Sequence, residues 1–150
     1  MMLKYRHILF LVCIVSFFAA CKKDEVVETY DPEPQFRADT TAIRAFIKTN
    51  NIPALKDSYG IFYQILEPGT GSVTYTTATK ITAEYEGKLL NGTVFDSSKG
   101  TPVSFTLGGF IPGWQIGIQK IQKGGKIRLI IPSYYAYGTR SPSSSVPANS

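Results

Sequence analysis

The side chains in this sequence that could do chemistry are aromatic rather than ionic. The single histidine, His7, lies in an N-terminal stretch with the features of a removable signal, so the mature chain would have no Ser-His or Cys-His pair and no histidine ligand for zinc. Carboxylates are few and scattered, and no glycine-rich loop stands between a strand and a helix, as phosphate binding requires. Hydrolysis, redox chemistry and phosphoryl transfer are therefore disfavoured.

Aromatic residues gather in the second half of the chain, at Tyr85, Phe95, Phe105, Phe110, Trp114, Tyr135 and Tyr137. Aromatic side chains at inward strand positions are ordinarily core, and we favour that interpretation for Phe105 and Tyr135. Asp96 differs because it follows an apolar pair at the end of a predicted strand, where its carboxylate would face an aromatic concavity. A buried carboxylate needs a partner, so Asp96 is the candidate polar group of this region.

One short helix must position the only tryptophan. Trp114, Ile118 and Ile121 recur at i, i+4 and i+7, which places them on one helical face. Pro112 suits the first turn, and residues 123–125 (Lys-Gly-Gly) supply a cation and a glycine cap at the end. An amphipathic helix among strands must lie across a sheet and cover its apolar face.

Alternating apolar residues predict strands on both sides of that helix. On the first, Ile61, Tyr63 and Ile65 would share one face. Asn91-Gly92 is the strongest hairpin signal in the chain. The predicted strands span residues 59–66, 80–90, 93–96, 103–107 and 126–131. The fold class is therefore α+β, with an antiparallel twisted sheet wrapped around one short helix, and we assign residues 57–150 to this domain.

A second helix is expected before the strands, within an N-terminal helical segment at residues 36–56. Phe36, Ile43, Phe46 and Ile47 have helical spacing and predict a helix near residues 38–49, with Asp39 or Thr40 as its cap. Its narrow apolar stripe should pack on the following domain, and a role in dimerisation is the alternative. Residues 21–35 are polar, contain two prolines and indicate a flexible tether.

The first 20 residues have the pattern of a secretory signal. A basic start is followed by an apolar run of 13 residues, from Ile8 to Ala20, which is too short for an ordinary membrane-spanning helix. The next residue, Cys21, completes a stretch similar to the lipobox of bacterial lipoproteins, although Phe18 stands where an aliphatic residue is usual. This resemblance implies lipidation of Cys21 and a place in the bacterial cell envelope, at the periplasmic face or the cell surface. A cleaved signal with an incidental cysteine is the alternative.

Charge and cysteine content exclude further classes. The chain has 150 residues and a formal net charge of +5, and removing residues 1–20 with Lys4 and Arg6 leaves 14 basic and 11 acidic groups, or +3. That charge is too mild and too scattered to indicate nucleic-acid binding. Cys13 would be lost with the signal, so no disulfide or cysteine metal site is expected. The charged run at residues 22–25 resembles a sorting signal of surface lipoproteins, or is simply a solvated stretch.

Five motifs in order resemble the FKBP-type peptidyl-prolyl isomerases. They are Tyr85-Glu86-Gly87-Lys88-Leu89, Asn91-Gly92-Thr93-Val94-Phe95-Asp96-Ser97-Ser98, Phe105-Thr106-Leu107-Gly108, Ile111-Pro112-Gly113-Trp114 and Tyr134-Tyr135-Ala136-Tyr137-Gly138. The resemblance runs from about residue 57 to residue 150. Five motifs in register are far more specific than an isolated Gly-Trp pair.

The resemblance implies a peptidyl-prolyl cis-trans isomerase with a hydrophobic cradle floored by the Trp114 indole. The residues it implies as catalytic are Asp96, Tyr137, Ile111 and Phe95, with the Ile111 N–H receiving a substrate carbonyl. The residues it implies as substrate-binding are Tyr85, Val103, Phe110, Trp114 and Val146. Proline-containing polypeptides would be the substrates, tacrolimus-like compounds are further candidate ligands, and neither cofactor nor metal is needed.

This sequence departs from the family pattern in two places. Val103 stands where the family often has a second phenylalanine, and the Ser-rich loop at residues 139–145 lacks the family's occasional histidine. The pattern also continues beyond Val146 and Pro147 with a final, central strand, so we expect the intact gene product to extend past residue 150. Two alternatives to an isomerase stay open: a non-catalytic binding or chaperone module, and a platform for a sugar or small ligand.

Overall fold

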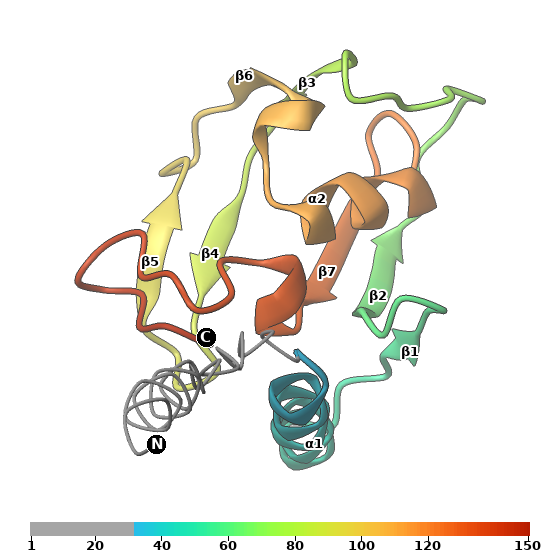
Figure 1. Ribbon diagram of the computed structural model, residues 1–150. Helices are drawn as coiled ribbons and strands as arrows, with labels where there is room; N and C mark the ends of the chain where they lie inside the picture. The colour runs from blue at the N-terminus through green and yellow to red at the C-terminus, as the bar shows by residue number, and fades with distance from the viewer. Residues whose placement is uncertain (1–31) are drawn as a thin grey trace, which may run out of the picture. The chain divides into compact units, whose positions relative to one another are not determined.

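The computed structural model describes residues 32–150, and the predicted signal, most of the predicted tether and Cys21 lie outside the described residues. The helices and strands follow one another as drawn in Figure 1: α1 (Glu33–Thr49), β1 (Leu55–Lys56), β2 (Phe62–Glu67), β3 (Lys80–Ala83), β4 (Glu86–Lys88), β5 (Val94–Ser97), β6 (Val103–Thr106), the 3-10 helix η1 (Leu107–Gly109), α2 (Pro112–Gly117), the 3-10 helix η2 (Ile118–Lys120), β7 (Lys126–Ile130) and the 3-10 helix η3 (Ser133–Tyr135). Between residues 32 and 150, no helix has both the length and the apolar run that crossing a bilayer requires.

All strand pairs are antiparallel, and the predicted α+β class with its N-terminal helix is confirmed. The strands form three sheets instead of one continuous sheet: β1-β2-β7, β3-β6 and β4-β5. The stretch predicted as one strand at residues 80–90 is divided into β3 and β4, which pair with β6 and β5. The chain therefore presents β4 and β5 as a separate hairpin, at the left of Figure 1.

Helix α1 packs on one face of the three-stranded sheet. Its Ile43 is buried with Phe62 of β2 and Ile130 of β7, which are direct neighbours in the β2–β7 register. The predicted packing of this helix on the following domain is therefore confirmed. Burial of these three aliphatic and aromatic side chains supplies roughly 1.5–3 kcal/mol each relative to exposure.

The start of α1 differs from the prediction. The helix begins at Glu33 with proline in its first turn, so residues 33–35 are helical and the predicted start at residue 38 was too late. Proline lacks the N–H that a first turn leaves unpaired, so Pro34 begins this helix where it had suggested a tether. Asp39 and Thr40 lie inside the helix, and neither caps it.

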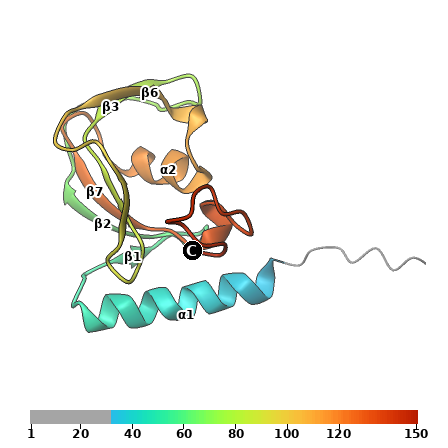
Figure 2. The same cartoon turned by 90° about the vertical axis from the view of Figure 1, so that its left-hand side faces the viewer.

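Helix α2 covers the opposite face of the same sheet, as Figure 2 shows. A Cβ at Gly113 would lie 2.5 Å from Cγ2 of Ile131, and one at Gly117 would collide with Leu129, so the helix backbone rests directly on the end of β7 and the residue after it. The predicted start is confirmed, because proline occupies the first turn, but the predicted glycine cap is wrong: α2 ends at Gly117, and Gly124, with a φ of +78°, lies in the turn before β7. The predicted helix continues after residue 117 as the 3-10 turn η2.

Of the residues predicted to share one face of the strand at 59–66, Ile61 is fully buried and Tyr63 partly buried. Phe62 of the other face is also buried, under α1, whereas Ile65 near the end of the strand is exposed. Helices α1 and α2 cover the two faces of this sheet, so adjacent residues at the start of β2 are both buried. In contrast, the Asn91-Gly92 turn is where it was predicted, with Gly92 at a φ of +91° and its N–H donating to the carbonyl of Leu89 at 2.9 Å.

Candidate active site

The β4–β5 hairpin places Tyr85 and Asp96 side by side. The Tyr85 hydroxyl donates a hydrogen bond of 2.9 Å to Oδ2 of Asp96, which is exposed. Ser98 fixes the backbone of Tyr85 from the facing strand, because its Oγ accepts the Tyr85 N–H at 3.1 Å and its own N–H donates to the Tyr85 carbonyl at 3.0 Å. The hydrogen bond to Asp96 is the main cause that raises the pKa of Tyr85 above its ordinary value of 10.0, and burial adds to it.

Trp114 lies at the centre of a group of touching rings. Its ring centroid is 5.6 Å from that of Tyr85 in an edge-to-face contact and 5.2 Å from that of Phe110 in a stacked contact. Phe105 of β6 contacts both Phe110 and Trp114, with its ring centroid 4.0 Å from that of Phe110 and 5.4 Å from that of Trp114. Helix α2 therefore holds the indole where residues from two of the sheets converge.

Phe105 was expected to be ordinary core and instead belongs to this aromatic group. It is only partly buried, and its closest ring neighbour is Phe110. The signal was present in the sequence, because strand alternation places residues 103, 105 and 107 on one face.

Phe95 and Tyr137 form the second pair of rings, 6.4 Å apart and nearly perpendicular. Phe95 precedes Asp96 on β5, and Tyr137 follows η3. Burial is the first cause that raises the pKa of Tyr137, and the charge of Asp96 is the second, so the Tyr137 hydroxyl and the Asp96 carboxylate belong to one neighbourhood. Asp96 thus connects this pair to Tyr85 and, through Tyr85, to Trp114.

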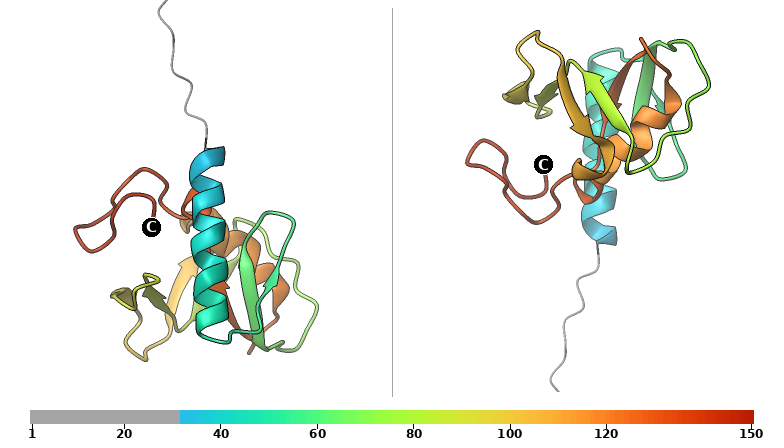
Figure 3. Two further views of the ribbon diagram at one scale, coloured as in Figure 1. Left: turned by 90° about the horizontal axis from the view of Figure 1, so that it is seen from below. Right: turned by 90° about the horizontal axis from the view of Figure 1, so that it is seen from above.

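The remaining predicted site residues surround this group to different degrees. Ile111 directly precedes α2, where its N–H lies outside the hydrogen bonds of the helix, and its carbonyl accepts the Trp114 N–H at 2.9 Å. Val103 on β6 is 43% exposed. Val146 is 2% exposed, and its carbonyl accepts the Ser141 hydroxyl at 2.6 Å. The loop that contains Val146 runs outward from the sheets in both views of Figure 3 and is closed by a hydrogen bond of 2.7 Å from Asn149 N–H to the Gly138 carbonyl.

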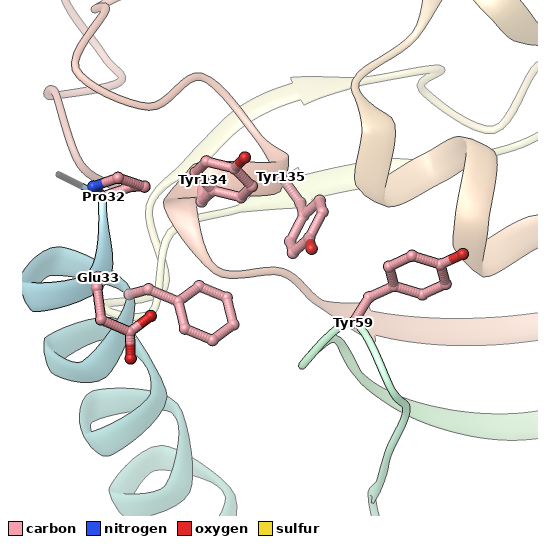
Figure 4. A pocket seen from close by; sticks show the side chains of 6 residues that line it. Pro32, Glu33, Tyr59, Tyr134 and Tyr135 are labelled. Carbon is pink, nitrogen blue, oxygen red and sulfur yellow. The ribbon is translucent and has the colours of Figure 1, made fainter. Parts of the chain in front are cut away.

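A different cleft lies between the start of α1 and η3. Its lining residues are Pro32, Glu33, Phe36, Tyr59, Tyr134 and Tyr135, and Figure 4 shows the three tyrosines facing the first turn of the helix. Tyr135, which was expected to be core, is half-buried and contacts Phe36 and Tyr59 edge-on. This cleft shares no residue with the predicted site, so the aromatic residues that line it form a group separate from that site.

Comparison with known proteins identifies the fold around the first group. Residues 71–150 match the family described as "FKBP-type peptidyl-prolyl cis-trans isomerase". The chain belongs to this family. The FKBP match covers β3 to η3, and therefore every predicted site residue of the aromatic group.

Individual relatives agree with the family. The chain is 43% identical over 95 residues to the FKBP-type peptidyl-prolyl cis-trans isomerase FkpA of Escherichia coli (strain K12), covering 62% of this chain and 34% of FkpA. It is 45% identical over 100 residues to the probable FkpA of Neisseria meningitidis serogroup B, covering 62% of this chain and 35% of that protein. The chain thus spans about a third of the length of the curated relatives it matches.

Solved structures show the same fold. The crystal structure of E. coli FkpA matches with a TM-score of 0.63 and 33% identity, over 78% of this chain and 58% of that chain. A peptidyl-prolyl cis-trans isomerase from Pseudomonas syringae pv. tomato matches with a TM-score of 0.62 and 29% identity, over 81% of this chain and 88% of that one. The FKBP-like fold inferred from the five motifs is therefore confirmed.

Proposed function

We propose that this chain accelerates cis-trans isomerisation of X-Pro bonds in polypeptides, at the site formed by Tyr85, Phe95, Asp96, Trp114 and Tyr137. Membership of the FKBP family supports the reaction type. The observation that carries the proposal for this chain is the contact network, in which Asp96 accepts the Tyr85 hydroxyl, Tyr85 contacts Trp114, and the neighbouring Phe95 contacts Tyr137. The site thus combines an apolar surface for a proline ring with a small number of polar groups.

The reaction needs no proton transfer. Rotation about a peptide bond faces a barrier of about 18–20 kcal/mol because amide resonance makes the bond planar. The planar amide is polar, whereas the twisted transition state has lost its resonance and has a less polar carbonyl. An apolar aromatic environment therefore favours the twisted form over the planar one, and this differential binding lowers the barrier.

The polar groups would act on the twisted geometry. In this proposal the Ile111 N–H donates to a substrate carbonyl, and the Tyr137 hydroxyl and Asp96 contact the polar atoms next to the rotating bond. Tyr85, Phe110 and Trp114 would hold the proline ring, with Val103 and Val146 at the edge of the site. Tacrolimus-like compounds would compete for the same apolar surface.

The proposal is tested by refolding a protein whose slow phase is limited by proline isomerisation, with increasing amounts of the chain. Uncatalysed exchange takes tens to hundreds of seconds, so a catalyst shortens this phase in proportion to its concentration. A heat-denatured sample of the chain is the control. If the phase is unchanged while the chain still binds unfolded polypeptides, the non-catalytic binding module becomes the better interpretation.

We also propose that the mature chain begins at a lipidated Cys21 and acts on exported or surface proteins in the bacterial cell envelope. The supporting observation is the basic, apolar and small-residue order of residues 1–21. Mass spectrometry of the native protein would detect the acyl chains on its first residue. Release of a Cys21→Ser variant from the membrane fraction would support the anchor, and unchanged fractionation of that variant would contradict it.

A further inference from the structure

The carboxylate of Asp39, in the middle of α1, binds a serine 94 residues later in the chain. Oδ2 of Asp39 accepts the Ser133 N–H at 2.7 Å and the Ser133 hydroxyl at 2.6 Å. Oδ1 accepts the Gln35 side-chain amide at 2.6 Å. Ser133 is only 2% exposed, so loss of this acceptor would leave a buried N–H and a buried hydroxyl without a partner.

The same serine closes the turn that contains Tyr137. Its carbonyl accepts the N–H of Ala136 at 2.9 Å and the N–H of Gly138 at 2.8 Å. These two donors are the residues on either side of Tyr137. The backbone at Tyr137 is therefore fixed at both flanks by Ser133, which Asp39 in turn holds by its N–H and its hydroxyl.

Phe36 contributes to the same joint, by which we mean the contact between α1 and η3, from one helical turn earlier. Residues 36 and 39 lie three positions apart and so share a face of α1. The Phe36 ring contacts Tyr134 at 6.4 Å and Tyr135 at 6.2 Å between ring centroids, both edge-to-face. Helix α1 thus contacts η3 through the Asp39 carboxylate and the Phe36 ring.

We propose that Asp39 is a positioning residue for the isomerase site: through Ser133 it fixes the turn that presents Tyr137 to Phe95 and Asp96. Asp39 lies outside the residues that match the FKBP family, so this contribution comes from the preceding helix. The inference rests on the proposed function only in its catalytic part, because the position of Tyr137 can be measured without substrate.

The structural measurement compares Asp39→Ala with Arg37→Ala in the full chain by NMR. Arg37 is on the same helix and forms only an exposed pair with Glu33, so its loss controls for changes in α1 itself. We expect Asp39→Ala to weaken the cross-relaxation between the Phe95 and Tyr137 rings. The ring contact of Tyr85 with Trp114, which α1 does not touch through this joint, should stay and serves as the internal control.

The kinetic measurement compares the same variants in the peptide isomerisation assay. A misplacement of about 1 Å can cost as much as 100-fold in rate, so we expect Asp39→Ala to lower kcat about tenfold, with a smaller change in KM. Asp39→Asn keeps an oxygen acceptor for Ser133 and should recover most of the rate. Arg37→Ala should behave as the unmodified chain.

The two measurements separate the outcomes. A lower melting temperature for Asp39→Ala, with the Phe95–Tyr137 contact and kcat both unchanged, would overturn the positioning role and leave a merely stabilising one. Should Asp39→Ala fail to fold, Ser133→Ala decides, because it removes the hydroxyl bond and keeps the N–H bond to Asp39. An unmodified chain without activity would overturn the proposed function, while the NMR comparison would still test the positioning of Tyr137.

Discussion

The hydroxyl of Tyr85 donates to the carboxylate of Asp96 at 2.9 Å while the ring of Tyr85 stands edge-on to Trp114 at 5.6 Å. One side chain therefore connects the only carboxylate predicted in the site with the Trp114 indole. Because Asp96 is exposed, the hydrogen bond fixes its orientation without removing it from solvent. Replacing Asp96 should consequently change the pKa of Tyr85 more than the stability of the fold.

Replacing Asp96 by alanine should release the Tyr85 hydroxyl. We expect the pKa of Tyr85 to fall toward its ordinary value, since the bond to Asp96 is the largest cause of its rise. Isomerase activity should fall by roughly two- to tenfold, the equivalent of one hydrogen bond of about 0.5–1.5 kcal/mol. Tyrosine-selective NMR titration and the peptide assay measure the two effects.

Glu86→Ala is the matched control for that change, because it removes the same charge from the exposed side of the same hairpin. Glu86 pairs with Lys88 at the surface, with both side chains about half exposed. An equal loss of activity in both variants would mean that charge alone, rather than the contact with Tyr85, affects the reaction.

Tyr137→Phe removes one hydroxyl and keeps the ring against Phe95. If this hydroxyl contacts the substrate in the transition state, kcat should fall by roughly two- to tenfold with little change in melting temperature. Tyr134→Phe is the control from the same turn, since Tyr134 is exposed and lies outside the aromatic site. Identical kcat values for Tyr137→Phe and the unmodified chain would remove Tyr137 from the mechanism.

The pH dependence of stability follows from three tyrosines whose pKa values are raised in the folded chain: Tyr85, Tyr135 and Tyr137. A raised pKa means that the folded state holds the proton more tightly than the unfolded state. The resulting stability is complete below the unfolded value of 10.0 and is lost as the pH rises through the folded pKa values. Urea unfolding measured at a series of pH values from about 8 to about 11, a range that includes the ordinary tyrosine pKa, should show the beginning of this decline.

The Tyr85→Phe/Tyr137→Phe double variant should lose part of that decline, because two of the three groups can no longer ionise. Tyr135 remains in this variant, and burial is the main cause of its raised pKa. A double variant with an unchanged pH profile would assign the alkaline loss of stability to other groups.

Local sequence signals predicted α2 and the hairpin well, because each depends on neighbours in the chain. Pro112 begins the helix and Gly92 supplies the left-handed turn residue, although the helix ends before the predicted glycine cap. The role of Asp39 could not be predicted in this way. Its position suggested a helix cap, whereas its partner Ser133 lies 94 residues away.

The buried face of β2 was beyond local pattern for the same reason. Alternation placed Ile61 and Ile65 on one face, yet only Ile61 is buried, and α1 buries Phe62 of the other face as well. The aromatic site could be predicted only in part. Strand and helix periods predict that its residues point inward. Only tertiary contacts show that Phe105 packs on Trp114 whereas Tyr135 packs on Phe36.

Gly113→Ala should test how closely α2 lies on β7. The added methyl group would meet Cγ2 of Ile131 at 2.5 Å, and the branched side chain of Ile131 has few alternative rotamers. Overpacking of this kind costs about 1–3 kcal/mol of unfolding free energy. Gly109→Ala is the control, because no atom lies within 4 Å of its added methyl. Equal chemical denaturation curves for the two variants would contradict the tight packing.

Lys120→Met should leave the buried carboxylate of Asp57 without its ion-pair partner. Nζ of Lys120 lies 3.0 Å from Oδ2 of Asp57, whose side chain is 8% exposed. Within the described residues this Oδ2 accepts no hydrogen bond, so the ion pair with Lys120 is its interaction. Oδ1 of Asp57 would keep the N–H groups of Tyr59 and Ile61, so the loss should stay below the cost of about 3–5 kcal/mol for a fully broken buried pair. Thermal unfolding should show the loss, with Lys88→Met as a control, because surface pairs contribute only about 0–1 kcal/mol. Adding Asp57→Asn to Lys120→Met should restore stability, and a double variant as unstable as the single one would contradict the charge argument.

The family match begins at residue 71, but the joint at Ser133 reaches back to residue 39. A recombinant fragment trimmed to the matched stretch would lose α1, β1 and β2, so Ile130 would face water and Ser133 would have no anchor. Grafting this module onto another protein therefore requires its leading helix as well, and chimeras cut at the family boundary should yield a turn around Tyr137 that samples several conformations.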